Sequence, residues 1–348
     1  MKAAVLNEYG QFRWTEVPDP RLSETQVLIR VNYAGICGTD LHIFKGEFHP
    51  RTKLPLIPGH EFAGTVQAVG KKVWKFSVGD KVVIDPIIWC GECAACKIGH
   101  YPACTSLKLL GVDMDGGFGE YAAVEESMLY KLDESISERE AALIEVYSIG
   151  FHAANRAGVK EDDTVAVWGA GRIGQSILQA VRTKTQNTVF MVDVIDERLA
   201  VARNVYENVI AINPLKEDPV EVIKSHTKGD GADIAIEAVG HAKKIKAKPN
   251  PIQSCINAIR GAGTVCVLGL TSKETPLFMR DLIWKEAKII TSRVSHGEYT
   301  EAIRRLSQGS LHPEALISEI IEAENIQRAF ALLQEQPEQY LKILLKLN

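Results

Sequence analysis

The chain lacks the features that mark membrane, secreted and nucleic-acid-binding proteins. Its 348 residues contain no apolar run approaching the ~20 residues that span a bilayer. The apolar stretch after Met1 is too short for a secretory signal, so we expect a soluble cytoplasmic protein with no membrane partner. Basic residues are not in excess, because 40 Lys and Arg stand against 44 Asp and Glu, and the net charge of −4 predicts no nucleic-acid partner.

Internal repeats and low-complexity tracts are also missing from the sequence. The composition, 46% hydrophobic and 24% charged, is that of an ordinary globular protein, and the chain is longer than one core usually fills. We therefore expect two domains. The basic run at 243–250 is interpreted as a solvated helix end and loop.

The sequence shows two different secondary-structure patterns, one in each part of the chain. Up to about residue 130, short β-type stretches such as 27–32 and 81–84 are broken by Gly, Pro and Asp, which predicts a barrel-like β domain. From about residue 160, strands at 164–168, 188–192, 232–236 and 263–268 alternate with helical patterns. That alternation predicts a parallel sheet covered by helices.

Cysteine is not scarce, and four of the seven cysteines fall within one short run. Two Cys-x-x-Cys steps and a return loop are formed by Cys90, Cys93, Cys96 and Cys104. This spacing lets four thiolates surround one Zn²⁺ at about 2.3 Å and close its coordination sphere, which predicts a structural zinc site. A disulfide pair or four buried thiols are the alternatives, and disulfides are rare in the cytoplasm.

Three glycines follow the apolar strand at 164–168 in the pattern Gly-Ala-Gly-Arg-Ile-Gly. The glycines are Gly169, Gly171 and Gly174, and the apolar residues that share a helical face after them are Ile173, Ile177, Leu178 and Val181. The glycines therefore lie where a strand turns into a helix, which is the context of a dinucleotide site. The first permits the tight turn, the second lets a pyrophosphate approach the backbone, and the helix N-terminus offers N–H groups to the anion.

Asp193 ends the next predicted strand, 24 residues after Gly169. This is near the spacing of a carboxylate that binds the adenosine ribose, and a 2′-phosphate there would meet like charge. We therefore expect NAD rather than NADP, with a helix N-cap as the alternative role of Asp193. Arg198 is placed against the adenine or toward solvent, and Arg172 near the pyrophosphate.

A second set of metal-type ligands lies in the β-rich half. Cys37 begins the sequence Cys-Gly-Thr-Asp-Leu-His, and His60 and Glu61 follow a Pro-Gly pair. A thiolate, an imidazole and a carboxylate form the mixed ligand set of an open catalytic zinc, and Glu145 is a fourth candidate. Taken singly, each residue has an ordinary alternative as a packed thiol, a core histidine or a surface charge.

In their order along the chain, Gly-Ile-Cys-Gly-Thr-Asp, Pro-Gly-His-Glu, the four-cysteine run and Gly-Ala-Gly-x-Ile-Gly resemble the zinc-containing medium-chain alcohol dehydrogenases. Within that family the chain looks most like the sorbitol, threonine and sugar-acid dehydrogenase branch, whose Ala-Leu-Ile-Glu segment is here 142–145. The resemblance implies an α/β protein. A β-rich GroES-like catalytic domain would span 1–150 and 291–348, and an NAD-binding Rossmann domain with a doubly wound parallel sheet would span 151–290.

The resemblance also implies roles for individual residues. Cys37 and His60 would hold the catalytic zinc together with Glu61 or Glu145, and Asp40 would orient His60. Thr39 would take the substrate proton and pass it through the nicotinamide ribose to His42 and solvent. The positions that line the polyol pocket in the branch are here Phe44, Phe118 and Arg293.

The predicted activity is hydride transfer between NAD and a secondary alcohol, with zinc as the Lewis acid. A polyol or a sugar acid is the expected substrate. Threonine and butanediol remain alternatives, although the chain lacks the tryptophan-bearing loop of threonine dehydrogenases. A zinc-free quinone or enoyl reductase is a second reading.

A non-catalytic NAD-sensing protein is a third reading, motivated by Arg172 and by Val146, where the branch usually has Pro. We expect a homodimer or a homotetramer, with 265–270 near a sheet edge.

Overall fold

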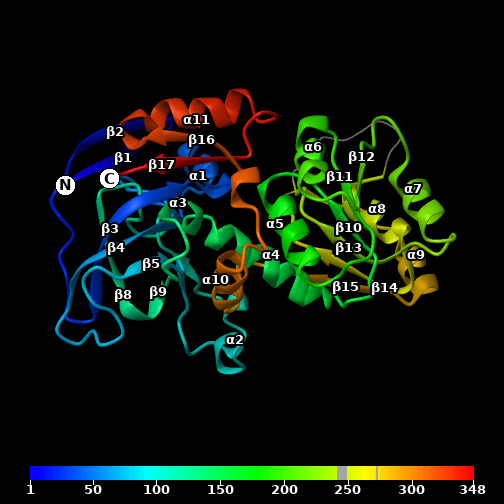
Figure 1. The fold of residues 1–348 in the computed structure, drawn as a ribbon, viewed down its shortest axis with the longest axis horizontal. Coiled ribbons are helices and arrows are strands. Elements are labelled where there is room, and N and C mark those ends of the chain that lie inside the picture. The colour runs from blue at the N-terminus through cyan, green and yellow to red at the C-terminus, as the bar shows by residue number, and fades with distance from the viewer. Residues whose placement is uncertain (241–248, 272) are drawn as a thin grey trace. The chain divides into compact units, whose positions relative to one another are not determined.

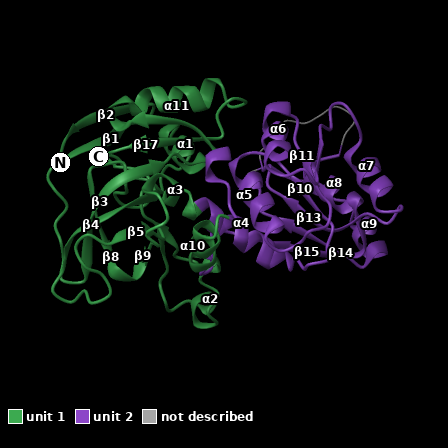
Figure 2. Ribbon diagram, viewed as in Figure 1, with its two compact units in different colours: residues 1–145, 299–309, 316–348 green, residues 146–298, 310–315 purple. Residues whose placement is uncertain are grey.

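The computed structural model describes residues 1–240, 249–271 and 273–348, so most of the basic run at 243–250 lies outside the described residues. The chain forms two compact units (Figure 2). Unit 1 comprises residues 1–145, 299–309 and 316–348, and unit 2 comprises residues 146–298 and 310–315. Within the described ranges, none of the helices combines the length and apolarity that crossing a membrane requires.

Unit 1 is built mainly of antiparallel strands (Figure 1). Its main sheet has the order β16 (Ile317–Glu322), β17 (Lys342–Lys346), β3 (Gln26–Gly35), β4 (Glu61–Val69), β5 (Lys81–Ile84) and β9 (Leu129–Lys131), and β8 (Tyr121–Glu125) also pairs with β3. Two short pairs complete the strands: β1 (Lys2–Glu8) with β2 (Gln11–Glu16), and β6 (Ile87–Ile88) with β7 (Lys108–Leu109). The helices are α1 (Gly38–Phe44), α2 (Ala94–Lys97), α3 (Glu138–Ala141), α10 (Tyr299–Ser307) and α11 (Ile326–Glu335).

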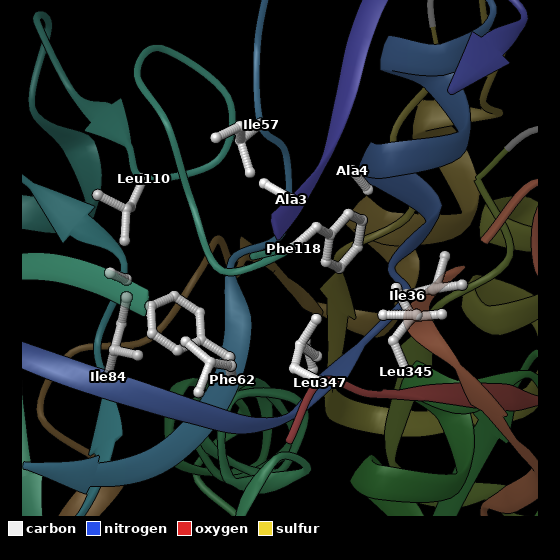
Figure 3. Close-up of a cluster of buried hydrophobic side chains, with 14 of the residues drawn as sticks. Ala3, Ala4, Ile36, Ile57, Phe62, Ile84, Leu110, Phe118, Leu345 and Leu347 are labelled. Carbon is white, nitrogen blue, oxygen red and sulfur yellow. The ribbon is translucent and has the colours of Figure 1, made fainter. Parts of the chain in front are cut away.

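The core of unit 1 follows from the alternation of side chains along β3. Val27, Ile29 and Val31 are fully buried, whereas Arg30 between them is exposed, as a strand with one covered face requires. Figure 3 shows Phe118 beside Ala3 and Ala4 in this core. β17 pairs antiparallel with β3, so the C-terminal segment supplies a strand to a sheet that begins near the N-terminus.

Unit 2 contains a six-stranded sheet whose pairings are all parallel. Its strands, in spatial order, are β12 (Val209–Ile212), β11 (Val189–Val192), β10 (Val165–Trp168), β13 (Ala232–Glu237), β14 (Ile259–Val267) and β15 (Lys288–Thr291). Its helices are α4 (Ile144–Ala157), whose first two residues belong to unit 1, α5 (Arg172–Arg182), α6 (Asp196–Val205), α7 (Pro219–His226), α8 (Pro251–Ala258) and α9 (Met279–Lys285). This is the 3-2-1-4-5-6 order of a Rossmann fold, so the predicted fold class is confirmed.

Strand order corrects one expectation. The predicted strand at 263–268 lies mostly within β14, which is paired with β13 on one side and β15 on the other. The segment 265–270 is therefore not at a sheet edge. β15, for which no strand was predicted, is the end strand of the sheet.

Candidate functional site

The four-cysteine run forms a compact lobe around α2. The Sγ atoms of Cys90, Cys93, Cys96 and Cys104 all lie within 4.8 Å of one another. The Sγ atoms of Cys90 and Cys96 are 4.0 Å apart, and those of Cys90 and Cys104 are 3.6 Å apart. Zinc–sulfur bonds of about 2.3 Å give a tetrahedron with edges of about 3.8 Å, whereas a disulfide needs about 2.05 Å. The thiols therefore fit one zinc ion.

Backbone groups already favour thiolate in this lobe. The N–H groups of Cys96 and Thr105 lower the pKa of Cys93 to about 6. Burial, followed by the neighbouring Cys93, raises the pKa of Cys96 to about 12, so the two thiols share their protons unequally. Because zinc binds thiolate rather than thiol, occupation of the lobe releases protons and depends on pH.

The second group of ligand-type atoms is assembled by the pairing of β3 with β4. Gly35 lies opposite Glu61 in that register, so the end of β3 and the start of β4 come together. Cys37 follows β3 as the N-cap of α1, and His60 directly precedes β4. One ligand atom from each of Cys37, His60 and Glu61 lies within 4.8 Å of the other two. A short loop and an antiparallel register thus explain a cluster drawn from two sequence motifs.

Asp40 holds two of these residues in place. Its Oδ2 accepts the backbone N–H of Cys37 at 2.8 Å, and its Oδ1 lies 3.4 Å from Nδ1 of His60. Asp40 and His60 are both buried. Burial lowers the pKa of His60, but the charges of Asp40 and Cys37 outweigh it and raise that pKa well above the usual value. Since Nδ1 faces Asp40, Nε2 is the nitrogen that a metal would use.

Glu145 adds a further buried carboxyl group, in the first turn of α4. It is not a member of the compact group formed by Cys37, His60 and Glu61. Burial, and next the negative charge of Glu61, raises the pKa of Glu145 to about 8. Several acidic groups therefore share a buried region, and a divalent cation would relieve their repulsion. These residues fit a zinc ion.

Thr39 and His42 lie on the same short helix as Asp40. Oγ1 of Thr39 is 3.8 Å from Sγ of Cys37, so the hydroxyl stands beside the ligand group. His42 is one turn further along α1, its side chain is 42% exposed, and its Nδ1 pairs with the Glu47 carboxylate. The helix therefore carries a hydroxyl next to the candidate metal group and an imidazole open to solvent.

In unit 2 the glycine motif follows β10, and β10 and β13 lie where the strand order reverses. Gly169 has φ of +96°, which favours glycine. A methyl group on Gly174 would lie 1.6 Å from the Gly169 carbonyl oxygen, so glycine is required for α5 to start here. A methyl group on Gly171 would meet only Nη1 of Arg198, at 3.8 Å, which leaves the backbone open to a ligand. Arg172 and Ile173 begin α5.

Asp193 follows β11 and faces the glycine motif. Its Oδ2 accepts the N–H of Ala170 at 2.6 Å, and its Oδ1 accepts the N–H of Ile195 at 2.9 Å. Each carboxylate oxygen has a second lone pair, so these bonds still permit contact with a ribose hydroxyl. Gln175, which sequence reasoning missed, is buried and donates to the carbonyl oxygens of Ala170 and Arg198 at 3.2 and 2.8 Å. In the sequence, the signal for this residue was a polar amide among the apolar residues of α5.

The three residues expected to contact substrate lie in different surroundings, two in a core and one on the surface. Phe44 is buried and its ring centroid lies 5.4 Å from that of Phe12 and 5.0 Å from that of Phe330. Phe118 is fully buried in the same core (Figure 3). Arg293 is exposed in the segment after β15 in unit 2. Core packing accounts for both phenylalanines, and the substrate roles of all three residues stay predictions.

Lys342 is the second residue that sequence reasoning missed. It lies at the start of β17, is fully buried, and its ammonium group pairs with the Glu61 carboxylate. Its sequence context, Leu-Lys-Ile-Leu-Leu, was interpreted only as an apolar segment. A lysine between apolar strand residues was the available signal, although such lysines usually point to solvent.

Comparison with known proteins places the chain among dehydrogenases. The family model Alcohol dehydrogenase GroES-like domain matches residues 23–134, and the model Zinc-binding dehydrogenase matches residues 173–308. The starvation-sensing protein RspB of Escherichia coli K12 is 32% identical over 346 residues, which cover 99% of both chains. Sorbitol dehydrogenase of Bacillus subtilis 168 is 32% identical over 354 residues, which cover 100% of this chain and 98% of that protein. The crystal structure of RspB from Escherichia coli CFT073 in complex with NADH matches with a TM-score of 0.89 at 32% identity, covering 99% of both chains.

Proposed function

Because the chain belongs to the zinc-containing medium-chain alcohol dehydrogenase family and is an NAD-dependent oxidoreductase, we propose that its substrate is a polyol or a sugar acid. The enzyme interconverts a secondary alcohol and its ketone by moving a hydride between the alcohol carbon and NAD. The observation that supports zinc-dependent alcohol oxidation is the group formed by Cys37, His60 and Glu61, with the Thr39 hydroxyl beside it.

Cys37 and His60, with a carboxylate from Glu61 or Glu145, would hold the catalytic zinc. Zinc bound there supplies a Lewis acid that makes loss of the alcohol proton easier. Asp40, whose Oδ1 lies 3.4 Å from Nδ1 of His60, would orient the imidazole so that Nε2 could bind the metal. The same carboxylate fixes the backbone of Cys37, so one residue positions two ligands.

Thr39 and His42 would carry the proton. The Thr39 hydroxyl lies close enough to the ligand group to accept the proton that the alcohol gives up. His42 is exposed and pairs with Glu47, and an imidazole can both accept and donate a proton, so it can pass the proton on to solvent. His42 is therefore proposed as the last group of the relay.

The dinucleotide would bind at the glycine motif of unit 2. Gly169, Gly171 and the N-terminus of α5 form the surface for the pyrophosphate, with Arg172 at the first turn of the helix. The Asp193 carboxylate would accept ribose hydroxyl groups and repel a 2′-phosphate, which favours NAD. Arg198, which lies near Gly171, would flank the adenosine.

Arg293 is proposed as a residue that binds the substrate. Its guanidinium group can bind a hydroxyl or a carboxylate, which suits both polyols and sugar acids. Sorbitol dehydrogenase of Bacillus subtilis, a relative over the full chain, acts on a polyol, as its name states. Threonine and butanediol are the alternative substrates.

A screen of NAD⁺ reduction tests the proposal. Zinc-loaded protein is mixed with polyols, aldonic acids, 2,3-butanediol and threonine, and NADH is followed by its absorbance. We expect the highest kcat/KM with a polyol or an aldonic acid, and a loss of about tenfold or more in Arg293→Ala relative to Arg304→Ala, a surface control. Preference for threonine or butanediol contradicts the proposed substrate class. NADH binding without turnover of any alcohol supports the NAD-sensing alternative instead.

We also propose a homodimer formed through α9 and β15. Exposed apolar side chains gather on these elements and beside them: Phe278, Met279, Ile283, Trp284 and Ile289. β15 ends its sheet, so a second copy of β15, antiparallel about a twofold axis, would pair with the open strand edge and cover the apolar side chains. Light scattering after gel filtration should show that Trp284→Glu gives monomers whereas Trp74→Glu, at another exposed tryptophan, does not. A Trp284→Glu protein of unchanged mass contradicts this interface.

A further inference from the structure

Glu237, the last residue of β13, carries a buried carboxylate that the proposed chemistry does not use. The residue is 2% exposed. Its Oε1 accepts the backbone N–H groups of Val239 and Gly240 at 2.8 and 2.9 Å, and its Oε2 accepts the backbone N–H of Gly269 at 3.1 Å. Burying a carboxylate is costly unless hydrogen bonds replace its contacts with water. These three bonds replace such contacts, and they fasten two separate loops to one side chain.

The two loops follow neighbouring strands of the unit 2 sheet. β13 lies between β10 and β14, and the three strands are parallel, so the loops leave the sheet at the same edge (Figure 1). Residues 238–240 follow β13, and residues 268–270 follow β14. The backbone N–H of Leu268 also donates to the carbonyl oxygen of Glu237, at 2.9 Å. Glu237 therefore joins the loops through both its main chain and its side chain.

Glycines let the two loops approach each other closely. A methyl group on Gly269 would lie 2.2 Å from the backbone nitrogen of Gly240 and 2.5 Å from Oε2 of Glu237. A methyl group on Gly240 would lie 2.6 Å from the carbonyl oxygen of Leu270. The loops therefore leave no room for a side chain at either position, and the carboxylate fills the space beside Gly269.

The loop after β13 also contacts the glycine motif. A methyl group on Gly169 would lie 2.9 Å from the carbonyl oxygen of Ala238. The N–H of Ala238 donates to the carbonyl oxygen of Trp168 at 2.8 Å. Because this bond is made by the main chain alone, the glycine turn does not depend on the Glu237 carboxylate. Loss of the carboxylate should free residues 239–240 from residues 268–270 and leave the turn in place.

The position of the loops in the sheet relates them to one half of the dinucleotide. A Rossmann fold binds the two mononucleotide halves on either side of the point where the strand order reverses. Asp193, the proposed ribose ligand of the adenosine half, follows β11. The nicotinamide half would therefore bind on the other side of the reversal, at the ends of β13 and β14.

We propose that Glu237 is a positioning residue for the nicotinamide half of NAD, because it holds residues 239–240 against residues 268–270. The proposal rests on the dinucleotide site proposed above and adds a residue that sequence reasoning did not single out. Glu237 acts through the backbone of two loops and needs no contact with substrate or cofactor.

Binding of NADH and of ADP-ribose, which lacks the nicotinamide, separates the two halves of the site. In Glu237→Gln, one acceptor oxygen becomes an NH₂ group that faces an N–H of one loop, so that loop is released. We expect the dissociation constant of NADH to rise by about tenfold and that of ADP-ribose to stay within about twofold. Glu217→Gln, at an exposed position of unit 2, is the matched control and should change neither constant.

Gly269→Ala tests the same contact if Glu237→Gln does not fold. The methyl group would push the loops apart while the Glu237 charge remains, so NADH binding should again weaken by about tenfold and ADP-ribose binding should not. Gly261→Ala is the control, because a methyl group there would meet no atom of the described residues within 4 Å.

Equal weakening of both ligands, or unchanged binding of NADH, in either folded variant overturns the proposal. Wild-type protein that binds neither ligand overturns it together with the proposed dinucleotide site. Both readouts are binding constants, so a wild-type protein that oxidises no alcohol contradicts the proposed function without altering this test.

Discussion

Asp40 contacts both His60 and the backbone of Cys37, through different oxygens of one buried carboxylate. Oδ1 lies 3.4 Å from Nδ1 of His60, and Oδ2 accepts the Cys37 N–H at 2.8 Å. The two residues that best fit a catalytic zinc are therefore oriented by a third residue from the same short helix.

Replacing this carboxylate by an amide should weaken the metal site. We expect Asp40→Asn to lower zinc affinity at the second site by roughly 10- to 100-fold, because the imidazole loses its orienting charge. Competition with a chelator measures the effect. Zinc at the four-cysteine lobe should be retained, and an unchanged affinity at the second site would show that Asp40 is only a cap of α1.

The four-cysteine lobe should stabilise the fold without taking part in the chemistry. We expect Cys104→Ser to lose one zinc ion per chain and to lower the melting temperature by about 5–10 °C. Activity at a permissive temperature should remain. Cys255→Ser changes a buried cysteine outside the lobe and is the control for zinc content. Full loss of turnover in folded Cys104→Ser protein would contradict a purely structural role.

Asp193 should set the preference between dinucleotides. We expect Asp193→Ser to raise KM for NAD by about tenfold, because the ribose loses a charged acceptor and Ala170 loses its hydrogen bond. KM for NADP should fall at the same time, since the repulsion is gone. Initial rates with both cofactors measure the change, with Glu197→Gln as an exposed acidic control. Equal KM shifts for both cofactors would indicate only local damage.

Acid should weaken unit 2 through Glu298. Burial raises the pKa of Glu298, but hydrogen bonds from His152, 2.9 Å away, and from the His296 backbone outweigh it and hold the pKa below the usual 4.5. A depressed carboxyl pKa contributes stability that is present above the unfolded value and is lost as the pH falls through the folded value. Glu298→Gln should therefore cost roughly 1–3 kcal/mol at pH 7 and less at lower pH.

Urea unfolding at pH 7 and below pH 4.5 checks this prediction. The difference in midpoint between wild type and Glu298→Gln should shrink as the pH falls. Glu207→Gln, at an exposed position of unit 2, should show no such trend. A difference that grows toward low pH would mean that the pKa of Glu298 is raised in the folded state.

The parts of the site that sequence predicted are those encoded locally. The four cysteines occupy one short run, and the glycine motif lies directly between β10 and α5, so spacing alone carries the information. Cys37 and His60 belong to separate motifs, yet their strands are neighbours along the chain and pair antiparallel. The fold class was predicted for the same reason, because each β-α unit of the Rossmann sheet is local.

The parts that sequence missed depend on long-range packing. Lys342 meets Glu61 across 281 residues, and nothing in the apolar context of β17 distinguishes a buried ammonium group from an exposed one. The order of strands in a sheet also depends on contacts between distant parts of the chain. The sequence therefore predicted a strand within β14, but not that this strand lies between two others in the sheet. The substrate role of Phe118 stays a prediction, because an apolar side chain fits a core and a pocket wall equally well, and periodicity does not separate the two.

The measurement that bears most directly on the central claim is made on His60→Ala. Zinc content, NADH binding by fluorescence and NAD⁺ reduction by a polyol are determined on the same folded sample. We expect zinc to fall from about two ions per chain to about one, turnover to be abolished, and NADH to bind with an unchanged dissociation constant. Turnover that survives the substitution, or NADH binding that disappears with it, would contradict a catalytic metal held by Cys37 and His60 apart from the dinucleotide site.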